Sequence, residues 1–463
     1  MKIISADYLY PILLTITLLA FASLYFTIFL PYFGEEGQYT ISAVEMFYHH
    51  YYWQPTTYGV YYWRPPFYNW LIVGVMHLTG VPKVLVAARI VAASSSVLTG
   101  LMLWFLTYRL FGQKLFALFT VAVLFSGDFL FRRGWIAYSD PLFALLVLVA
   151  IGFMWISVKE QRAIFWLPAP FALFAGMLTK AFTIYVFYAT ALIVLLAAYD
   201  HRNYFFKPAS IVAHLTAILL PVLWFNFAPN TNLQAMLGDI IHKGITEGYP
   251  LGRSYLGKIF SVFFEVLYRF MPIDLVVLYG LFRYKHPRDQ FPLNPQPVKP
   301  LLWILALSIA PYWLGPGKIM IRYFLPLYPF IAILFAYCIW RGGERRVELA
   351  TVVLAIGLII KCISSFIGLP WGENMDFPQQ AIANDIIDRS ESHQLYAGNM
   401  TSRLGLTIAS IIDTHRWPNA PLTLSPQSLT KGCVITVQPD TQSGLLQQTY
   451  HAKGAGHLYL YCQ

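Results

Sequence analysis

The chain has few charged residues. Asp, Glu, Lys and Arg make up 12% of its 463 residues, whereas soluble domains contain roughly 25%. Hydrophobic residues account for 57% of the chain, and apolar runs of about 20 residues recur, each long enough to cross a bilayer. This composition excludes an ordinary soluble protein and predicts an all-α polytopic membrane protein.

Cysteine is also scarce, with four residues in the whole chain. Cys338 and Cys362 fall in apolar segments and are interpreted as core residues. Cys433 and Cys462 both lie in candidate strands near the C-terminus. A disulfide between these two is a hypothesis that fits an oxidising compartment.

Negative charge is concentrated at the C-terminal end. Residues 371–463 contain seven acidic and five basic side chains, a net charge of −2, so residues 1–370 carry a net charge of +12 within the total of +10. A basic membrane region fits loops that face anionic lipid and an anionic ligand better than a nucleic-acid surface. We therefore expect membrane lipids as partners and no nucleic acid.

Eleven apolar segments are candidate membrane spans. They are 9–30, 84–107, 115–131, 141–158, 163–179, 181–198, 209–228, 260–283, 301–314, 323–340 and 347–369. Residues 67–80 are apolar too, but this stretch is short for a span and favours an interfacial or re-entrant helix. Basic residues in the short loops favour a cytoplasmic N-terminus, and an odd number of spans then puts the C-terminal region outside.

The sequence predicts two domains. Residues 1–370 form a transmembrane domain that includes a polar loop over residues 31–70. Residues 371–463 alternate a helix candidate, 378–389, with strand candidates at 394–398, 433–437 and 458–461. This pattern predicts a small soluble α/β domain outside the membrane.

Ionisable residues close to a membrane domain are usually functional. If residues 67–80 do not span, several charges emerge on the same side as the polar loop and assemble a site. They are Glu35, Glu36, Arg64, Asp140, Lys180, Lys318 and Arg322. Lys318 and Arg322 are four residues apart, so on a helix they share a face and could bind one phosphate.

Each of these residues has a simpler interpretation. Lys318 and Arg322 could snorkel to the interface, Lys180 could sit at the tip of a helical hairpin, and Asp140 could cap a helix. The pair His49-His50 has no second cluster of ligands nearby, so no metal is predicted. Aromatics from Tyr48 to Tyr62 suit an interfacial belt or stacking on a sugar.

Five motifs occur in an order that resembles a known family. They are Glu35-Glu36-Gly37-Gln38-Tyr39, the block Trp63-Arg64-Pro65-Pro66-Phe67-Tyr68, Ser139-Asp140-Pro141, Leu178-Thr179-Lys180, and Lys318 leading to Arg322-Tyr323-Phe324-Leu325-Pro326. Over residues 9–340 the chain resembles integral-membrane glycosyltransferases of the GT-C superfamily. The branch concerned contains lipid A aminoarabinose transferases, galacturonic acid transferases and protein O-mannosyltransferases. Glu35 occupies the position of the family's catalytic Asp.

The resemblance implies sugar transfer from a polyprenyl phosphate on the non-cytoplasmic face. The lipid phosphate leaves the sugar as a stable anion, so no general acid is needed to protonate it. One carboxylate then suffices as the base. The resemblance assigns catalysis to Glu35, supported by Glu36 or Asp140. It assigns binding of the donor to Arg64, Lys180, Lys318, Arg322, Tyr62 and Tyr323.

The expected function is that of an inverting glycosyltransferase in a bacterial inner membrane, with its active site facing the periplasm. Its co-substrate is a polyprenyl-phosphate sugar, no other cofactor is implied, and lipid A or lipopolysaccharide core is the expected acceptor. Protein hydroxyls are a second class of acceptor. A polyprenyl-phosphate or lipid transporter and a catalytically retired, lipid-binding family member remain alternatives, although paired broken spans typical of transporters are not visible.

Overall fold

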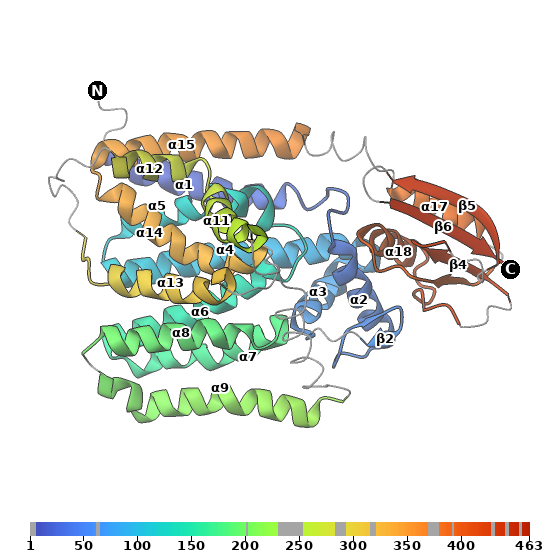
Figure 1. Cartoon of the computed structure of the whole chain (residues 1–463), viewed down its shortest axis with the longest axis horizontal. Coiled ribbons are helices and arrows are strands. Elements are labelled where there is room, and N and C mark those ends of the chain that lie inside the picture. Colours follow the sequence, from blue (N-terminus) through green and yellow to red (C-terminus); the bar gives the residue numbers. More distant parts are fainter. Residues whose placement is uncertain are drawn as a thin grey trace. The chain divides into compact units, whose positions relative to one another are not determined.

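The computed structural model describes residues 6–61, 65–200, 202–229, 253–282, 293–314, 321–368, 379–390, 393–426, 431–439, 444–452 and 456–463. Their contacts divide the chain into two compact units (Figure 1). The first unit comprises Met1–Tyr25, Ala93–Trp135 and Ser139–Cys362. The second comprises Phe26–Ala92, Ile136–Tyr138 and Ile363–Gln463.

The first unit is a helical bundle. Its helices are α1 (Ala6–Tyr25), α4 (Val84–Phe111, which begins in the second unit), α5 (Lys114–Leu124), α6 (Asp140–Glu160), α7 (Pro168–Lys180), α8 (Thr183–Ala198), α9 (Pro208–Phe227), α11 (Arg253–Tyr268), α12 (Ile273–Phe282), α13 (Val298–Leu314), α14 (Tyr328–Trp340) and α15 (Glu344–Ile363). Short helical turns η2 (Phe129–Arg133), η3 (Ala163–Trp166), η4 (Arg202–Phe206) and η5 (Ile321–Leu327) connect them. Helices α7, α8 and α9 lie side by side in Figure 1.

Helix α6 lies in the interior of this bundle. It packs against α7, α8 and η5, and 78% of its apolar window is buried, compared with 22% for α9. Both helices are apolar on all faces, so the difference reflects position: α6 faces protein, whereas most of α9 is left for lipid. The central position of α6 fixes Asp140, its first residue, at the end of the bundle core.

Seven helices in the described ranges are long and apolar enough to cross a membrane, and α5, α8 and α13 are shorter apolar helices. The predicted all-α membrane architecture is confirmed, whereas the number of spans stays a prediction. One predicted span, 260–283, is instead two helices, α11 and α12, which meet at a turn containing Pro272. Proline lacks the N–H that a continuous helix needs there.

The second unit combines residues from both ends of the chain. It contains α2 (Glu36–His49), the hairpin β1 (Thr56–Thr57) and β2 (Val60–Tyr61), α3 (Phe67–Thr79), η1 (Val81–Lys83) and η6 (Ser364–Gly368). The C-terminal part adds α17 (Gln379–Arg389), β3 (Leu395–Ala397), α18 (Arg403–His415), β4 (Cys433–Thr436), β5 (Leu445–Ala452) and β6 (Gly456–Cys462). Helix α3 has 13 residues, about 20 Å, which agrees with a segment too short to span.

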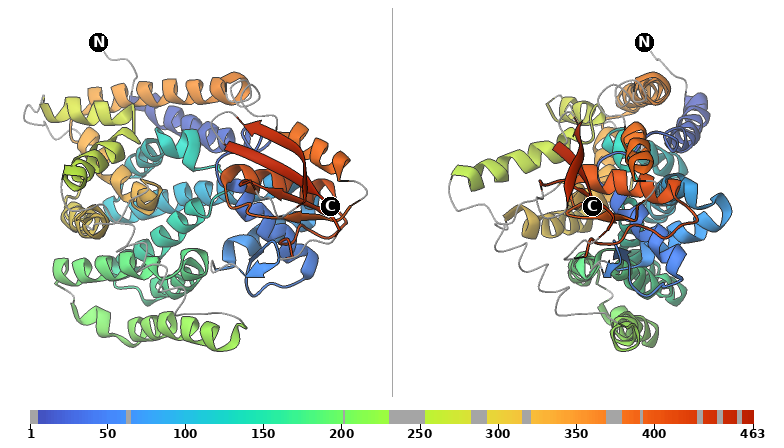
Figure 2. Two further views of the ribbon diagram at one scale, coloured as in Figure 1. Left: turned by 45° about the vertical axis from the view of Figure 1, so that its right-hand side comes forward. Right: turned by 90° about the vertical axis from the view of Figure 1, so that its right-hand side faces the viewer.

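The C-terminal part contains a four-stranded sheet with the strand order β3-β4-β6-β5. Strand β3 runs parallel to β4, and the other neighbours are antiparallel. Helices α17 and α18 lie next to this sheet (Figure 2), and their buried residues belong to the same hydrophobic core as those of the sheet. The small C-terminal α/β region was predicted, but α18 and β5 were not.

The polar loop and the C-terminal region share one hydrophobic core. Tyr32, Ile41 and Tyr58 are buried in the same cluster as Ile408 and Leu458. The Tyr32 hydroxyl lies 2.8 Å from the hydroxyl of Ser410, which also lies 2.7 Å from Thr40 Oγ1. Residues 31–70, which the sequence assigned to the membrane domain, therefore belong to the same compact unit as the C-terminal region.

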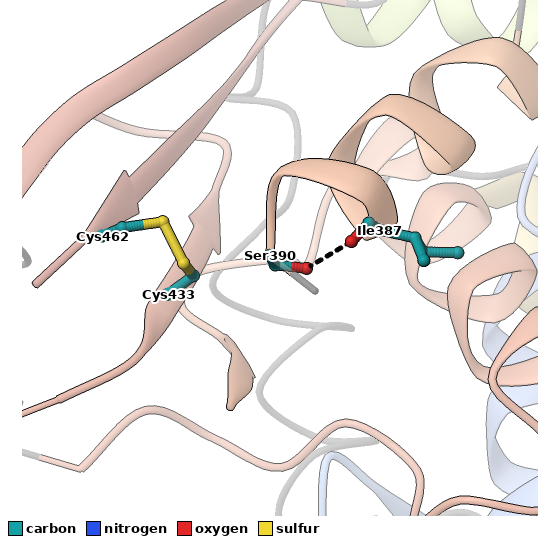
Figure 3. Close-up of a disulfide and its surroundings, with 4 residues drawn as sticks. All are labelled: Ile387, Ser390, Cys433 and Cys462. Atoms are coloured by element: carbon teal, nitrogen blue, oxygen red, sulfur yellow. Dashed lines mark hydrogen bonds between the residues drawn. A yellow bond between two sulfur atoms is a disulfide. The ribbon is translucent and has the colours of Figure 1, made fainter. Parts of the chain in front are cut away.

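The hypothesised disulfide is present. Cys433 and Cys462 lie directly opposite each other on β4 and β6, with their Cα atoms 4.1 Å apart, and their sulfur atoms are bonded (Figure 3). Figure 3 also shows Ser390, whose hydroxyl donates a hydrogen bond to the Ile387 carbonyl at the end of α17 (3.2 Å). Cys338 and Cys362 are free thiols and are partly exposed, so neither is the fully buried core residue that the sequence predicted.

Candidate active site

The Glu36 carboxylate is fully buried and bound on both oxygens. Arg89 donates from Nε to Oε1 at 2.8 Å and from Nη2 to Oε2 at 2.6 Å. The backbone N–H groups of Phe33 and Ala137 donate to the same two oxygens at 2.7 and 2.8 Å. Neither the Glu36 nor the Arg89 side chain is exposed. Glu36 therefore has a structural role, which is to fix the backbone of the segments around it.

Arg89 also organises the segment that precedes the Glu-Glu motif. Its guanidinium donates to the backbone carbonyls of Thr27, Ile28, Leu30 and Pro31. Sequence reasoning missed Arg89, which lies in α4 within the apolar run 84–107. The sequence did contain a signal for it, because a charged residue within an apolar run requires a buried partner.

Two glycines explain why the motif reads Gly34-Glu35-Glu36-Gly37. Gly34 has φ +65°, and a Cβ there would overlap the hydroxyl of Tyr138. A Cβ on Gly37 would come within 2.5 Å of the Leu406 carbonyl oxygen, so the start of α2 needs a glycine to approach the backbone of α18. The two glycines therefore let the motif fit between Tyr138 and α18.

Glu35 is placed differently from Glu36. Its side chain is 24% exposed, and its Oε1 lies 3.7 Å from Nη2 of Arg403, the first residue of α18. The backbone N–H of Glu35 donates to the Tyr138 hydroxyl at 2.8 Å, and Tyr138 stands two residues before Asp140 in the chain. Of the two adjacent carboxylates, only that of Glu35 is accessible to a ligand.

In the first unit, four of the predicted residues come together. Asp140 forms an ion pair with Lys180, the last residue of α7. The Lys180 ammonium also lies over the ring of Tyr323, 5.1 Å from its centroid. Arg322 and Arg133 are close enough to Asp140 to interact with it electrostatically. The structure thus joins Asp140, Lys180, Arg322 and Tyr323, which we call the Lys180 cluster.

The simpler interpretations, a hairpin tip for Lys180 and a helix cap for Asp140, hold only in part. Lys180 does lie at a hairpin tip, since α8 begins three residues after it. Asp140 lies in the first turn of α6, but its carboxylate pairs with Lys180. The partner expected for Lys180 was a phosphate, and the structure supplies a carboxylate.

A second ionic network adjoins the Lys180 cluster through Arg133. Asp128 lies 3.5 Å from Arg133 Nε and 3.4 Å from Arg269 Nη1, and Arg269 is paired with Glu265 at 2.9 Å. Positive and negative side chains therefore alternate from Glu265 to Arg133. Sequence reasoning missed Asp128 and Arg269, because their pairing depends on the turn between α11 and α12.

The second unit contains two further buried carboxylic acids, Glu45 in α2 and Asp413 in α18. Glu45 accepts from the backbone N–H of Tyr58 at 2.5 Å and of Gly59 at 3.2 Å. Asp413 accepts from the backbone N–H of Leu422 at 2.7 Å. Burial raises the pKa of Glu45 to about 7 and that of Asp413 to about 8. Both groups hold their protons at a pH where an exposed carboxyl is ionised.

Three predicted residues, Tyr62, Arg64 and Lys318, lie outside the described residues. Within the ranges that the structure does describe, no group of three or more His, Cys, Asp or Glu side chains could hold a metal ion.

Residues 63–225 match the family described as dolichyl-phosphate-mannose-protein mannosyltransferase. ArnT from Cupriavidus metallidurans bound to undecaprenyl phosphate has a similar structure, with a TM-score of 0.73 at 14% identity over 99% of this chain and 98% of that chain. Its apo state gives a TM-score of 0.73 at 14% identity, over 98% and 97% of the two chains.

A more distant likeness is to the archaeal oligosaccharyltransferase AglB from Archaeoglobus fulgidus in complex with an inhibitory peptide and a dolichol-phosphate. Its TM-score is 0.55 at 13% identity, over 88% of this chain and 64% of that chain. No protein of curated function matches the chain by sequence. The comparisons confirm, at the level of the fold, the GT-C resemblance that the five motifs indicated.

Proposed function

We propose that this chain, which has the GT-C fold, is an inverting glycosyltransferase that takes a sugar from a polyprenyl-phosphate donor. The observation that supports this most directly is the Lys180 cluster, where Lys180 and Arg322 accompany the single carboxylate of Asp140. An excess of cations at helix ends of a membrane bundle suits a lipid phosphate. ArnT was solved with undecaprenyl phosphate and AglB with a dolichol-phosphate, which supports a donor of this class.

In the proposed reaction, an acceptor hydroxyl or phosphate oxygen attacks the anomeric carbon of the donor sugar. The bond between that carbon and the phosphate oxygen breaks, and the electron pair leaves with the lipid phosphate. Lys180 and Arg322 stabilise the phosphate charge, and Asp140 holds the Lys180 ammonium in place. We assign Arg64, Lys318, Tyr62 and Tyr323 to binding of the same donor.

Glu35 is the proposed base, because its carboxylate is partly exposed. It accepts the proton from the attacking oxygen as the new glycosidic bond forms. Glu36 has all its bonds to Arg89 and two backbone N–H groups, so we assign it to positioning rather than to proton transfer. Asp140 has a supporting role through Lys180.

The proposed acceptor is lipid A or lipopolysaccharide core, and the proposed location is the periplasmic face of a bacterial inner membrane. Residues 371–463 then lie outside the membrane. Protein hydroxyls are the second candidate, favoured by the match of residues 63–225 to a family described as protein mannosyltransferases.

The experiment is transfer from radiolabelled polyprenyl-phosphate sugars to lipid A and to protein acceptors by the purified chain. We expect Glu35→Gln to lower the transfer rate by on the order of 10²- to 10⁴-fold while donor binding is retained. Asp388→Asn is the matched control, because it removes an exposed carboxylate from the same unit and should leave transfer unchanged. Unimpaired transfer by Glu35→Gln would contradict its role as base, and binding without transfer of any donor would favour a transporter or a retired enzyme.

A further inference from the structure

A groove in the first unit lies between the C-terminal end of α8 and the N-terminal end of α13. It has a volume of about 620 Å³, which is within the range of pockets that hold small ligands. Its wall from α8 and the residue that follows includes Ile193, Val194 and Tyr199, and its wall from α13 includes Lys299, Trp303 and Leu307.

The groove combines a long apolar body with one charge. Ile193, Trp303 and Leu307 are 62%, 54% and 42% exposed, which suits contact with hydrocarbon in a membrane protein. Among the described residues that line the groove, Lys299 is the only charged one. The lining therefore fits a ligand with an apolar chain and a single anionic group.

The groove is remote from the Lys180 cluster. Helix α8 begins three residues after Lys180 and reaches the groove at its other end, 16 residues or about 24 Å later. The groove is thus a separate place from the one assigned to the donor phosphate.

The end of the bundle where the groove lies is basic. The described connections at this end, which include those after α8 and α14 (at left in Figure 1), and the ends of the helices that they join contain ten basic and four acidic residues. The basic ones are Arg109, Lys114, Lys159, Arg162, Arg202, Lys207, Lys299, Arg341, Arg345 and Arg346. The acidic ones are Glu160, Asp200, Glu344 and Glu348. Such an excess attracts the leaflet that contains anionic headgroups.

The two helices are also short for a membrane. Helix α8 has 16 residues and α13 has 17, whereas about 20 are needed to cross the hydrocarbon core. The bilayer thins around short apolar helices, which brings the headgroups closer to their ends.

We propose that the groove binds one anionic glycerophospholipid from this leaflet. An acyl chain lies between Ile193 and Val194 on one side and Trp303 and Leu307 on the other, and the phosphate pairs with the Lys299 ammonium. The charge of the lining, the basic surroundings and the short helices favour this occupant. The proposal does not depend on the chain being a transferase.

The test measures lipids retained on the purified full-length chain. The protein is placed in nanodiscs of phosphatidylglycerol or phosphatidylcholine and released into mild detergent, and the retained lipids are counted by native mass spectrometry. We expect one phosphatidylglycerol per chain, and about fivefold less retention for Lys299→Gln, the effect of one basic residue on an anionic lipid. Lys114→Gln, an exposed lysine at the same end of the bundle, is the matched control and should retain the lipid.

A second variant keeps the charge but fills the groove. Ala197 is exposed in the groove wall, so Ala197→Trp can block the acyl chain without disturbing the interior, and we expect it to abolish retention. If it fails to fold, as judged by gel filtration, Ile193→Trp replaces it. Retention that is equal for the two lipids, unaffected by the filled groove, or lowered as much by Lys114→Gln would overturn the proposal. Stabilisation by inorganic phosphate alone, without lipid, would also overturn it.

Discussion

The Glu36–Arg89 pair and the Asp140–Lys180 pair are both ion pairs, but they have different surroundings. Glu36 and Arg89 have no exposed surface, and both carboxylate oxygens are bound. Lys180 is 25% exposed and shares Asp140 with the nearby Arg322 and Arg133. A saturated, buried pair holds a backbone, whereas a partly exposed pair with an excess of cations is suited to bind an anion.

The largest effect on stability is expected when the buried pair is broken. Arg89→Met leaves the Glu36 charge buried without its partner, which costs about 3–5 kcal/mol. Thermal melts in detergent measure the loss, and the double variant Glu36→Gln, Arg89→Met should recover part of it. The control is Arg389→Met, which removes a solvent-exposed ion pair with Asp385 in the same unit and should leave stability nearly unchanged. Equal losses of stability for Arg89→Met and Arg389→Met would contradict a special structural role of the buried Glu36–Arg89 pair.

The buried carboxyls Glu45 and Asp413 sharpen the comparison, because no cation is paired with either of them by a salt bridge in the described residues. Desolvation raises both pKa values, so the folded chain keeps these protons at a pH where the unfolded chain has lost them. Stability of the second unit should therefore fall as pH rises from about 4 towards 7 or 8, by at most about 1.4 kcal/mol per pH unit for each group.

The variants Glu45→Gln and Asp413→Asn remove these titrations while keeping the size of each side chain. Each should flatten the fall in thermal stability between pH 5 and 8, as measured by melts at a series of pH values. Asp388→Asn, an exposed carboxyl in the same unit, should leave the slope unchanged. A wild-type stability that does not fall over this range would contradict the raised pKa values of Glu45 and Asp413.

The smallest effect on stability is expected at the partly exposed pair. Lys180→Gln leaves the Asp140 carboxylate with Arg322 and Arg133 nearby, so the loss of stability should be smaller than that caused by Arg89→Met. The affinity of the Lys180→Gln variant for a polyprenyl phosphate should be about tenfold lower than that of the wild type, because a charge-assisted hydrogen bond to the phosphate is lost. Filter binding of radiolabelled lipid measures this, with Lys114→Gln as control. A large loss of stability with unchanged affinity would make Lys180 a structural residue.

Apolar run length predicted most helices of the first unit, because a membrane span is a local property of the sequence. The same reasoning predicted that Asp140, Lys180 and Arg322 lie close together, because every second loop between consecutive spans emerges on the same side of the membrane. The break at Pro272 was missed because its immediate neighbours, Met271 and Ile273, are apolar.

The pairing of Glu36 with Arg89 could not be predicted in the same way, because the two residues are 53 positions apart and meet only in the folded chain. The role of Gly37 likewise depends on the backbone at Leu406. Strand β5 begins Leu-Leu-Gln-Gln-Thr, without the alternation of apolar and polar residues that marks a half-buried strand.

The order of synthesis gives the discontinuous second unit a further consequence. Residues 26–92 leave the ribosome first, but Ile41 and Tyr58 share their core with Ile408 and Leu458. At about 5–20 residues per second, the first segment waits roughly 20 to 75 s until Leu458 has been made. A nascent or truncated chain therefore has its Glu35-Glu36 motif without a core beneath it, and the core of the second unit is complete only after strand β6 has been made.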